Sequence, residues 1–258
     1  MKYVIANWKM NLSVRESVAL VRGVLLTLQG REHFPRIVLC PSATALSEVH
    51  KLVTRTHLEL GAQNAGPERA GAMTGEVGLA QLEDVGCSYA IIGHSERRLQ
   101  FNESDEVVRQ RLTAVLASQL TPVLCVGESR EVREAGQAEA FVLKQLKSAL
   151  VGQHIARDKR VVVAYEPIWA IGAGQPATPA EAIAMHATIR QYLQAEFGLS
   201  GDKVAILYGG SIDGENAHQF LRESEIDGVL VGGASIKATE FAKVLAVACE
   251  VMEAQATV

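Results

Sequence analysis

The chain has 258 residues, of which 48% are hydrophobic and 21% are charged, and its formal net charge is −4 at pH 7. This composition is typical of a globular protein, and the length fits two small domains or one large α/β barrel. The absence of a basic run argues against nucleic-acid binding, and no apolar run approaches the ~20 residues that a membrane span needs. The four cysteines form no CxxC pair, which favours reduced core thiols over a disulfide or a metal site. No signal-peptide pattern opens the sequence, so we expect a cytoplasmic protein.

Eight short apolar runs recur along the chain, and a longer helical pattern follows each of them. The runs are Tyr3–Trp8, Arg36–Cys40, Leu58–Gln63, Tyr89–Gly93, Pro122–Val126, Arg160–Tyr165, Val204–Tyr208 and Gly228–Val231. Strands that alternate with helices predict a parallel sheet covered by helices, and eight such units in this length predict an α/β protein with a (β/α)8 barrel over residues 1–258 as one domain. An open doubly wound sheet is the alternative, but the G-x-G-x-x-G fingerprint after the first strand is missing.

Several helices carry start and stop signals. Ser13 is followed three residues later by Glu16, which predicts a capping box for a helix that runs through Gln29. A single long helix is predicted over residues 130–150. Thr178 with Pro179 predicts the start of another, which Gly198 ends.

The segment from Gln63 to Glu76 has neither a helical nor a strand period. A structureless stretch of this length in a compact domain is usually functional. A disordered insertion is the alternative, but Met73 and Thr74 between glycines favour a packed loop.

The residues at strand ends are the candidates for chemistry, because barrels place their catalytic groups there. Gly209-Gly210-Ser211 and Gly232-Gly233 follow the last two strands. Glycines at these two turns expose backbone N–H groups and let an anion approach closely, which favours a phosphate site over plain turns.

Three further strand ends carry Lys9, His94 and Glu166. Each has an ordinary interpretation, as a solvated charge, a structural histidine or a surface carboxylate. Together they predict a cation for a developing oxyanion, a neutral hydrogen-bond donor near a helix start, and a base. The loop after Glu166 is apolar at its start and glycine-rich at its tip, which predicts a lid. Its residues are Pro167, Ile168, Trp169, Ala170, Ile171, Gly172, Ala173 and Gly174. No metal-ligand cluster accompanies this set, which suits proton abstraction next to a carbonyl of a small phosphorylated sugar.

Five motifs, in order, resemble those of the triosephosphate isomerase family. They are Asn7-Trp8-Lys9-Met10-Asn11, Ile91–Arg98, Tyr165–Gly172, Tyr208-Gly209-Gly210-Ser211 and Val231–Ser235. The resemblance covers essentially the whole chain. It implies interconversion of dihydroxyacetone phosphate and D-glyceraldehyde 3-phosphate through an enediolate, in glycolysis and gluconeogenesis, with no cofactor.

The resemblance also implies a role for each site residue. Glu166 is then the base and His94 the electrophile, while Lys9 and Asn7 stabilise negative charge and Glu96 supports Lys9. Gly172, Ser211, Gly232 and Gly233 bind the phosphate through N–H groups. The loop that carries Thr74 docks on a second subunit, so a homodimer is implied.

Two lid positions, Ala173 and Pro176, depart from the family pattern and put the rate of lid motion in question. A different barrel enzyme for a phosphorylated substrate, or a barrel that only binds sugar phosphates, remains an alternative. The first would not need His94 and the lid after Glu166 together. The second is expected to have lost Glu166, His94 or Lys9, and the sequence keeps all three.

Overall fold

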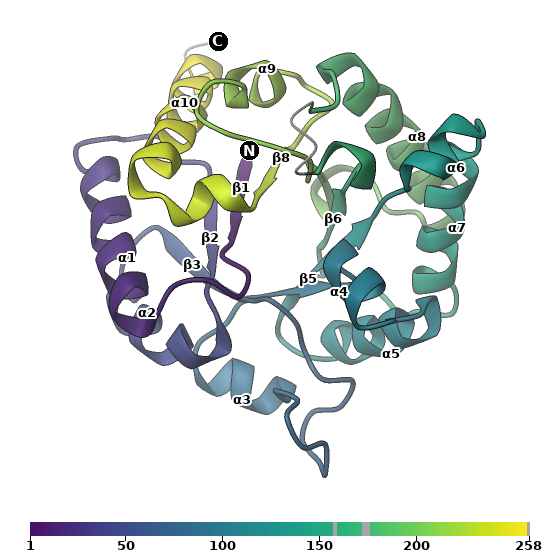
Figure 1. Cartoon of the computed structure of the whole chain (residues 1–258), viewed down its shortest axis with the longest axis horizontal. Helices are drawn as coiled ribbons and strands as arrows, with labels where there is room; N and C mark the ends of the chain where they lie inside the picture. Colours follow the sequence, from purple (N-terminus) through teal and green to yellow (C-terminus); the bar gives the residue numbers. More distant parts are fainter. Residues whose placement is uncertain (157–158, 172–175, 257–258) are drawn as a thin grey trace.

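A computed structural model describes residues 1–156, 159–171 and 176–256, and it contains a closed barrel of eight parallel strands (Figure 1). The strands are β1 (Tyr3–Asn7), β2 (Arg36–Cys40), β3 (Leu58–Ala62), β4 (Tyr89–Ile92), β5 (Thr121–Val126), β6 (Val161–Tyr165), β7 (Val204–Tyr208) and β8 (Gly228–Val231). Each strand pairs with the next in the sequence, and β8 pairs with β1, where Tyr3 lies opposite Gly228. The predicted (β/α)8 architecture is confirmed.

Helices surround the barrel on its outside (Figure 1). The α-helices are α1 (Val14–Leu28), α2 (Leu46–Val53), α3 (Leu79–Asp84), α4 (Ser95–Gln100), α5 (Asp105–Leu116), α6 (Arg130–Glu134), α7 (Ala138–Leu150), α8 (Pro179–Phe197), α9 (Ala217–Leu221) and α10 (Ala238–Ala256). Short 3-10 helices are η1 (Ala43–Ala45), η2 (Ile168–Ala170), η3 (Gly201–Lys203) and η4 (Gly233–Ile236).

The helix ends agree with the sequence signals at α1 and α8, where Ser13 and Thr178 form capping boxes. The prediction of one helix over residues 130–150 was wrong, because α6 and α7 are separate helices. Gly136 lies between them at a φ of 71°, in the left-handed region that ends a helix. The four cysteines are buried free thiols, as predicted.

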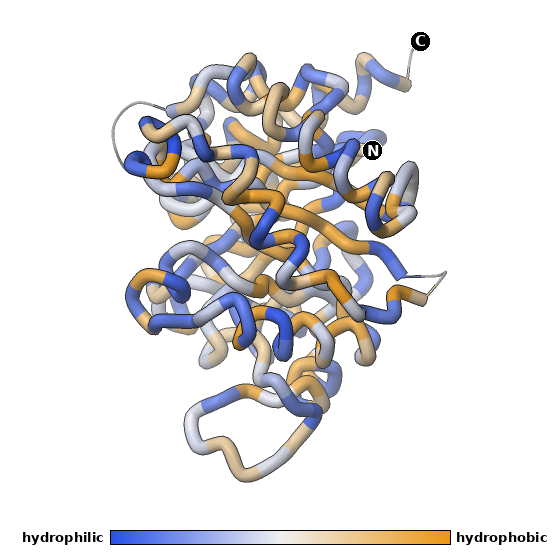
Figure 2. Tube along the Cα trace, turned by 90° about the vertical axis from the view of Figure 1, so that its right-hand side faces the viewer, coloured by the Kyte–Doolittle hydropathy of each residue, from blue (hydrophilic) through white to orange (hydrophobic). Residues whose placement is uncertain are grey.

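The strands bury both of their faces, and their side chains alternate between two apolar layers. In β6, Val162 and Ala164 belong to the layer inside the barrel, whereas Val163 and Tyr165 belong to the layer between barrel and helices. Figure 2 shows this apolar centre as a set of orange strands. The same alternation carries the next residue after Tyr165, Glu166, back to the barrel axis.

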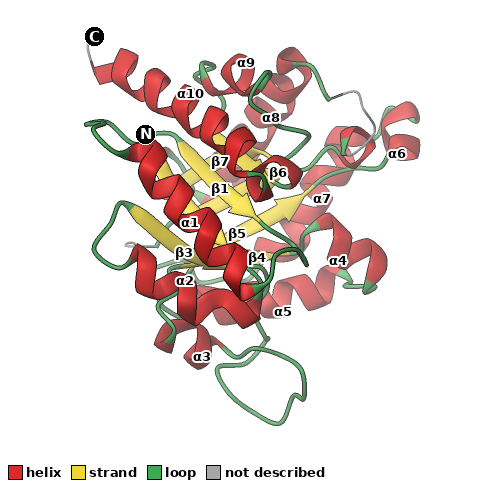
Figure 3. Cartoon of the chain, turned by 60° about the vertical axis from the view of Figure 1, so that its left-hand side comes forward, coloured by secondary structure: helices red, strands yellow, loops and turns green. Residues whose placement is uncertain are grey.

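One long loop, residues 63–78, leaves the barrel between β3 and α3 and projects away from it (Figures 2 and 3). Its two ends are held together by the Gly66 N–H, which donates to the Val77 carbonyl over 2.8 Å. Buried Arg111 of α5 donates to the Ala65 carbonyl and binds the Glu76 carboxylate at 2.7 Å. The base of the loop is therefore fixed by an ion pair, while its tip is exposed.

Candidate active site

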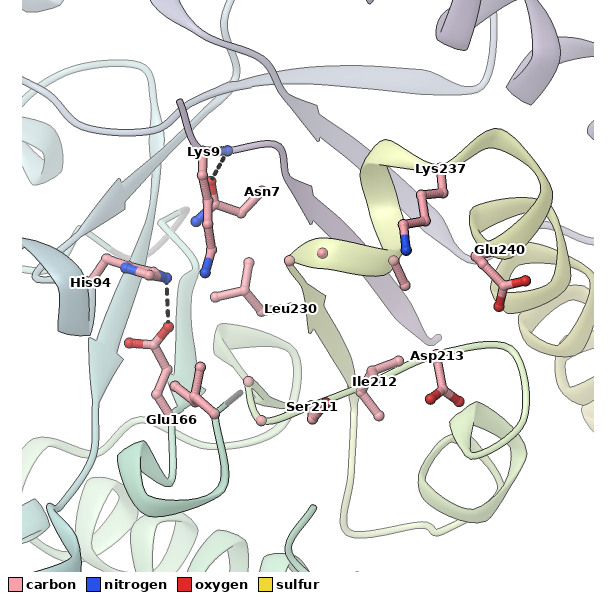
Figure 4. Close-up of a pocket in the computed structure, with 16 residues that line it drawn as sticks. Asn7, Lys9, His94, Glu166, Ser211, Ile212, Asp213, Leu230, Lys237 and Glu240 are labelled. Atoms are coloured by element: carbon pink, nitrogen blue, oxygen red, sulfur yellow. Dashed lines mark hydrogen bonds and ion pairs between the residues drawn. The ribbon is translucent and has the colours of Figure 1, made fainter. Parts of the chain in front are cut away.

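A cavity of about 540 Å³ opens where the strands end, as expected for a barrel of this class. Residues from five different strand ends line it, and most of the predicted site residues are among them. These are Asn7, Lys9, His94, Glu166, Ser211, Gly232 and Gly233. Figure 4 shows His94 and Glu166 pointing toward one another at one end of the pocket, with Lys9 extending toward them from β1.

Glu166 is buried, and both of its carboxylate oxygens have donors. Oε1 lies 2.9 Å from Nε2 of His94, and Oε2 accepts from the Ser95 N–H over 2.9 Å. Burial alone would raise the pKa of the Glu166 carboxyl, but His94 and the Ser95 N–H together hold it below its usual range. In this arrangement Glu166 is an ionised carboxylate turned to the wall of the pocket.

His94 has a place in the helix that the sequence did not indicate. Ser95 is the first helical residue of α4, and His94 itself is the N-cap. Nδ1 of His94 accepts from the Glu96 N–H over 3.2 Å, so the other nitrogen, Nε2, is the one that donates to Glu166. Burial acts to lower the pKa of His94, but the facing Glu166 carboxylate raises it overall. The predicted neutral ring follows from the helix start alone, without the effect of this facing carboxylate.

Lys9 is fixed by groups on two sides. Its Nζ lies 2.6 Å from Oε1 of Glu96, and its backbone N–H donates to Oδ1 of Asn7 over 3.1 Å. The backbone of Lys9 is in the left-handed region, at a φ of 54°, and the Gln63 side chain donates to its carbonyl. A non-glycine residue at positive φ persists only where its surroundings hold it, so the direction of this cation is built into the fold.

Gly209 at the end of β7 and Gly232 at the end of β8 have little space beyond their backbone, whereas a Cβ atom at Gly233 would meet nothing within 4 Å. A Cβ atom at Gly209 would lie 2.9 Å from Cγ of Glu166, and one at Gly232 would lie 3.2 Å from Cε of Lys9. Ser235 turns the η4 segment back by donating to the Gly232 carbonyl from its hydroxyl over 2.7 Å. These two glycines therefore let Glu166 and Lys9 lie close to the backbone that lines the pocket.

The described part of the predicted lid, Pro167 to Ile171, contains the short helix η2. Trp169 donates from Nε1 to Oε1 of buried Glu128 over 2.7 Å, and Arg133 lies over its ring at 4.3 Å. Tyr165 donates to the same carboxylate over 3.0 Å. Of the predicted lid residues, Ile171 lines the pocket. Gly172, Ala173 and Gly174 lie outside the described residues.

Glu96 contacts Lys9 but does not itself line the cavity, and Thr74 lies away from it. Thr74 lies on the exposed part of the 63–78 loop. Several further residues that line the pocket were not predicted: Ile212, Asp213, Leu230, Lys237 and Glu240. Lys237 could have been noticed, because it follows the predicted phosphate turn within five residues.

Within residues 1–156, 159–171 and 176–256, no group of three His, Cys, Asp or Glu side chains is placed to hold a metal ion. No helix in this part of the chain is long and apolar enough to cross a membrane. The chemistry available to the described site is that of a carboxylate, an imidazole, an ammonium group and backbone N–H donors. Fold and site together define a (β/α)8-barrel enzyme that is built for proton transfer on a small anionic molecule.

Comparison with known proteins identifies the family. The family model described as triosephosphate isomerase matches residues 2–248. The chain is 48% identical over 243 residues to the triosephosphate isomerase of Chloroflexus aurantiacus, a match that covers 94% of this chain and 97% of the relative. It is 46% identical over 240 residues to that of Roseiflexus sp. (strain RS-1), with 93% and 94% covered. The crystal structure of triosephosphate isomerase from Bartonella henselae superposes with a TM-score of 0.85 at 32% identity, over 95% of this chain and 98% of that one. The chain belongs to the triosephosphate isomerase family, and it is an isomerase.

Proposed function

We propose that Glu166, His94 and Lys9 carry out the reaction of this family, the interconversion of dihydroxyacetone phosphate and D-glyceraldehyde 3-phosphate. The two sugars are isomers, so the reaction needs only proton movement and no cofactor. The observation that carries the proposal is the position of the Glu166 carboxylate. It lies 2.9 Å from Nε2 of His94, in a cavity that also holds Lys9 and the glycine turns.

The first step is removal of a proton from the carbon next to the carbonyl. Glu166 must turn from His94 and Ser95 into the pocket to reach that carbon. The turn removes the two donors that lower its pKa, and burial, which raises the pKa, remains. The carboxylate therefore becomes a stronger base as it approaches the substrate, which is the change that general-base catalysis requires.

His94 changes in the opposite sense. Once Glu166 has turned away, the strongest influence that raises the pKa of His94 is gone, and burial favours the neutral ring. The Glu96 N–H continues to donate to Nδ1. This hydrogen bond requires an unprotonated Nδ1, so it favours the neutral ring over the imidazolium. Neutral His94 then donates from Nε2 to the substrate oxygen that becomes negative in the enediolate. The Lys9 ammonium and Asn7 stabilise the same charge.

The phosphate of the substrate is proposed to lie against the N–H groups of Ser211, Gly232 and Gly233, with Gly172 contributing from the lid. Oriented N–H groups bind anions without a competing positive charge close to the reacting carbon. A closed lid excludes water, so that the enediolate is protonated by the enzyme before it can lose its phosphate.

A homodimer is also proposed, with the 63–78 loop docked on the second subunit near its Asn7 and Lys9. Three large apolar residues are exposed: Met73 of this loop with an exposed fraction of 41%, Met10 after β1 with 96%, and Phe101 after α4 with 63%. Exposed apolar groups of this size indicate a surface that another chain covers. We also propose a cytoplasmic location, because the reaction of this family belongs to glycolysis.

The test is an isomerisation assay with D-glyceraldehyde 3-phosphate, in which the ketone product is reduced at the expense of NADH. The wild-type chain should turn over rapidly, and Glu166→Asp should lower kcat strongly, because the shorter side chain withdraws the carboxylate from the carbon. Near-normal turnover of Glu166→Asp would remove Glu166 from the role of base. A wild-type chain that binds a phosphoglycolate analogue but shows no turnover would indicate a barrel that only binds sugar phosphates.

A further inference from the structure

Lys237 is the second lysine of the active-site pocket, and its charge has no partner in the described structure. It directly follows the short helix η4 and lines the cavity at the end opposite His94 and Glu166 (Figure 4). Its side chain takes part in no ion pair or side-chain hydrogen bond among the described residues. Lys9, by contrast, has Nζ 2.6 Å from a Glu96 carboxylate oxygen, so part of its charge is already offset.

Two carboxylates, Glu240 and Asp213, line the same pocket as Lys237, and one oxygen of each accepts from another donor. Oε1 of Glu240 accepts from Nζ of Lys243 over 2.9 Å. Oδ1 of Asp213 accepts from the backbone N–H groups of Glu215 and Asn216 over 2.9 and 3.0 Å. The pocket therefore offers a cation, and these two anions already have other donors.

The position of Lys237 is unfavourable for the helix that follows it. It immediately precedes α10, a helix of 19 residues, and a positive charge at a helix start opposes the helix dipole. A carboxylate or a small capping side chain would stabilise the helix better there. The placement gains nothing for local structure, and it becomes favourable when an anion occupies the pocket in front of it.

We propose that Lys237 is a further binding residue for the substrate, which attracts and holds its phosphate dianion from the rim of the pocket. This inference rests on the proposed function, because it assumes a phosphorylated substrate. A phosphate monoester carries close to two negative charges at pH 7. To bind this phosphate, the described pocket otherwise offers neutral N–H groups and Lys9, which is paired with Glu96. Lys237 supplies a cation without an ion-pair partner among the described residues, at the end of the pocket opposite His94 and Glu166.

The experiment compares the wild-type chain with Lys237→Gln, Lys237→Arg and the control Lys144→Gln. Lys144 lies exposed on α7, outside the pocket, so its substitution changes the net charge equally. Inorganic phosphate is the probe. Three constants are measured at two ionic strengths: the Kd of phosphate by calorimetry, the constant for its inhibition of the isomerisation, and the KM for D-glyceraldehyde 3-phosphate. Lys237→Gln should raise all three constants about three- to tenfold at low salt, and less at high salt, with kcat within about twofold. Lys237→Arg and Lys144→Gln should resemble the wild type.

Thermal unfolding separates this role from a structural one. Removal of a cation from the start of α10 should leave Tm unchanged or raise it. Unchanged phosphate affinity in Lys237→Gln at low salt would overturn the proposal, as would a lower Tm accompanied by a lower kcat. A wild-type chain without turnover, but with phosphate binding that depends on Lys237, would refute the proposed function and leave this inference standing.

Discussion

Substitution of Gly209 by alanine tests whether the backbone after β7 positions the carboxylate of Glu166, the proposed base. The new Cβ atom would lie 2.9 Å from Cγ of Glu166 and 3.1 Å from the Tyr165 carbonyl oxygen. Carbon atoms in contact are about 3.5–4.0 Å apart, so the new Cβ atom and Cγ of Glu166 must separate by roughly a further 0.6–1.1 Å. The Tyr165 carbonyl accepts the Gly209 N–H over 2.7 Å and is part of the barrel. The Glu166 side chain is therefore expected to move.

A displacement of about 1 Å in a catalytic group costs on the order of 100-fold in rate, so kcat should fall by about that factor. The assay is steady-state isomerisation of D-glyceraldehyde 3-phosphate, with a crystal structure of the variant to locate Glu166. Gly23→Ala is the matched control, since its Cβ would meet only Ala238 at 3.9 Å, and it should keep full activity and gain about 0.5–1 kcal/mol in the free energy of unfolding. Wild-type kcat in Gly209→Ala, with Glu166 in its original position, would refute the reasoning.

Two other properties can be predicted with their direction. Thr74→Glu should convert the dimer to monomers in sedimentation velocity, because the docked loop would bury an unpaired charge; a persistent dimer would argue against the proposed docking. His186 is buried, and burial lowers its pKa to about 4, so the folded state favours the neutral ring. The imidazole of the unfolded chain binds a proton below about pH 6.5, whereas that of the folded chain does so only near pH 4. The free energy of unfolding should therefore be fully retained above about pH 6.5 and fall by up to about 3 kcal/mol as the pH decreases toward 4. His186→Gln should show a smaller difference between urea unfolding at pH 7 and pH 5, and an unchanged difference would contradict this assignment.

The barrel could be predicted from the sequence because its strands are buried on both faces and appear as continuous apolar runs. The ends of those runs also fixed which residues meet in the pocket, since all strands point the same way. Contacts that depend on side-chain conformation were not predictable. Nothing in the sequence indicates that Glu166 rests against His94 and the Ser95 N–H, or that His94 is the residue that caps α4.

Local signals failed where one residue decides between two similar outcomes. The pattern over residues 130–150 is helical on both sides of Gly136, and a glycine in a helix pattern can be tolerated or can end the helix. Its positive φ ends it here. The Arg111 ion pair beneath the 63–78 loop joins residues 35 positions apart, and no periodicity reports such a contact.

The hydrogen bond between Trp169 and Glu128 provides a fluorescence signal for the proposed lid. The chain has two tryptophans, and the other, Trp8, is fully buried, with an Nε1 that makes no hydrogen bond within the described residues. Trp8→Phe would therefore remove one indole without leaving an acceptor unsatisfied. The remaining fluorophore lies three residues after the base, beside the Arg133 cation and the Glu128 carboxylate. Any closure that separates Trp169 from these two charges changes its emission, so the opening and closing times of the lid become accessible to stopped-flow fluorescence in a protein without an attached dye.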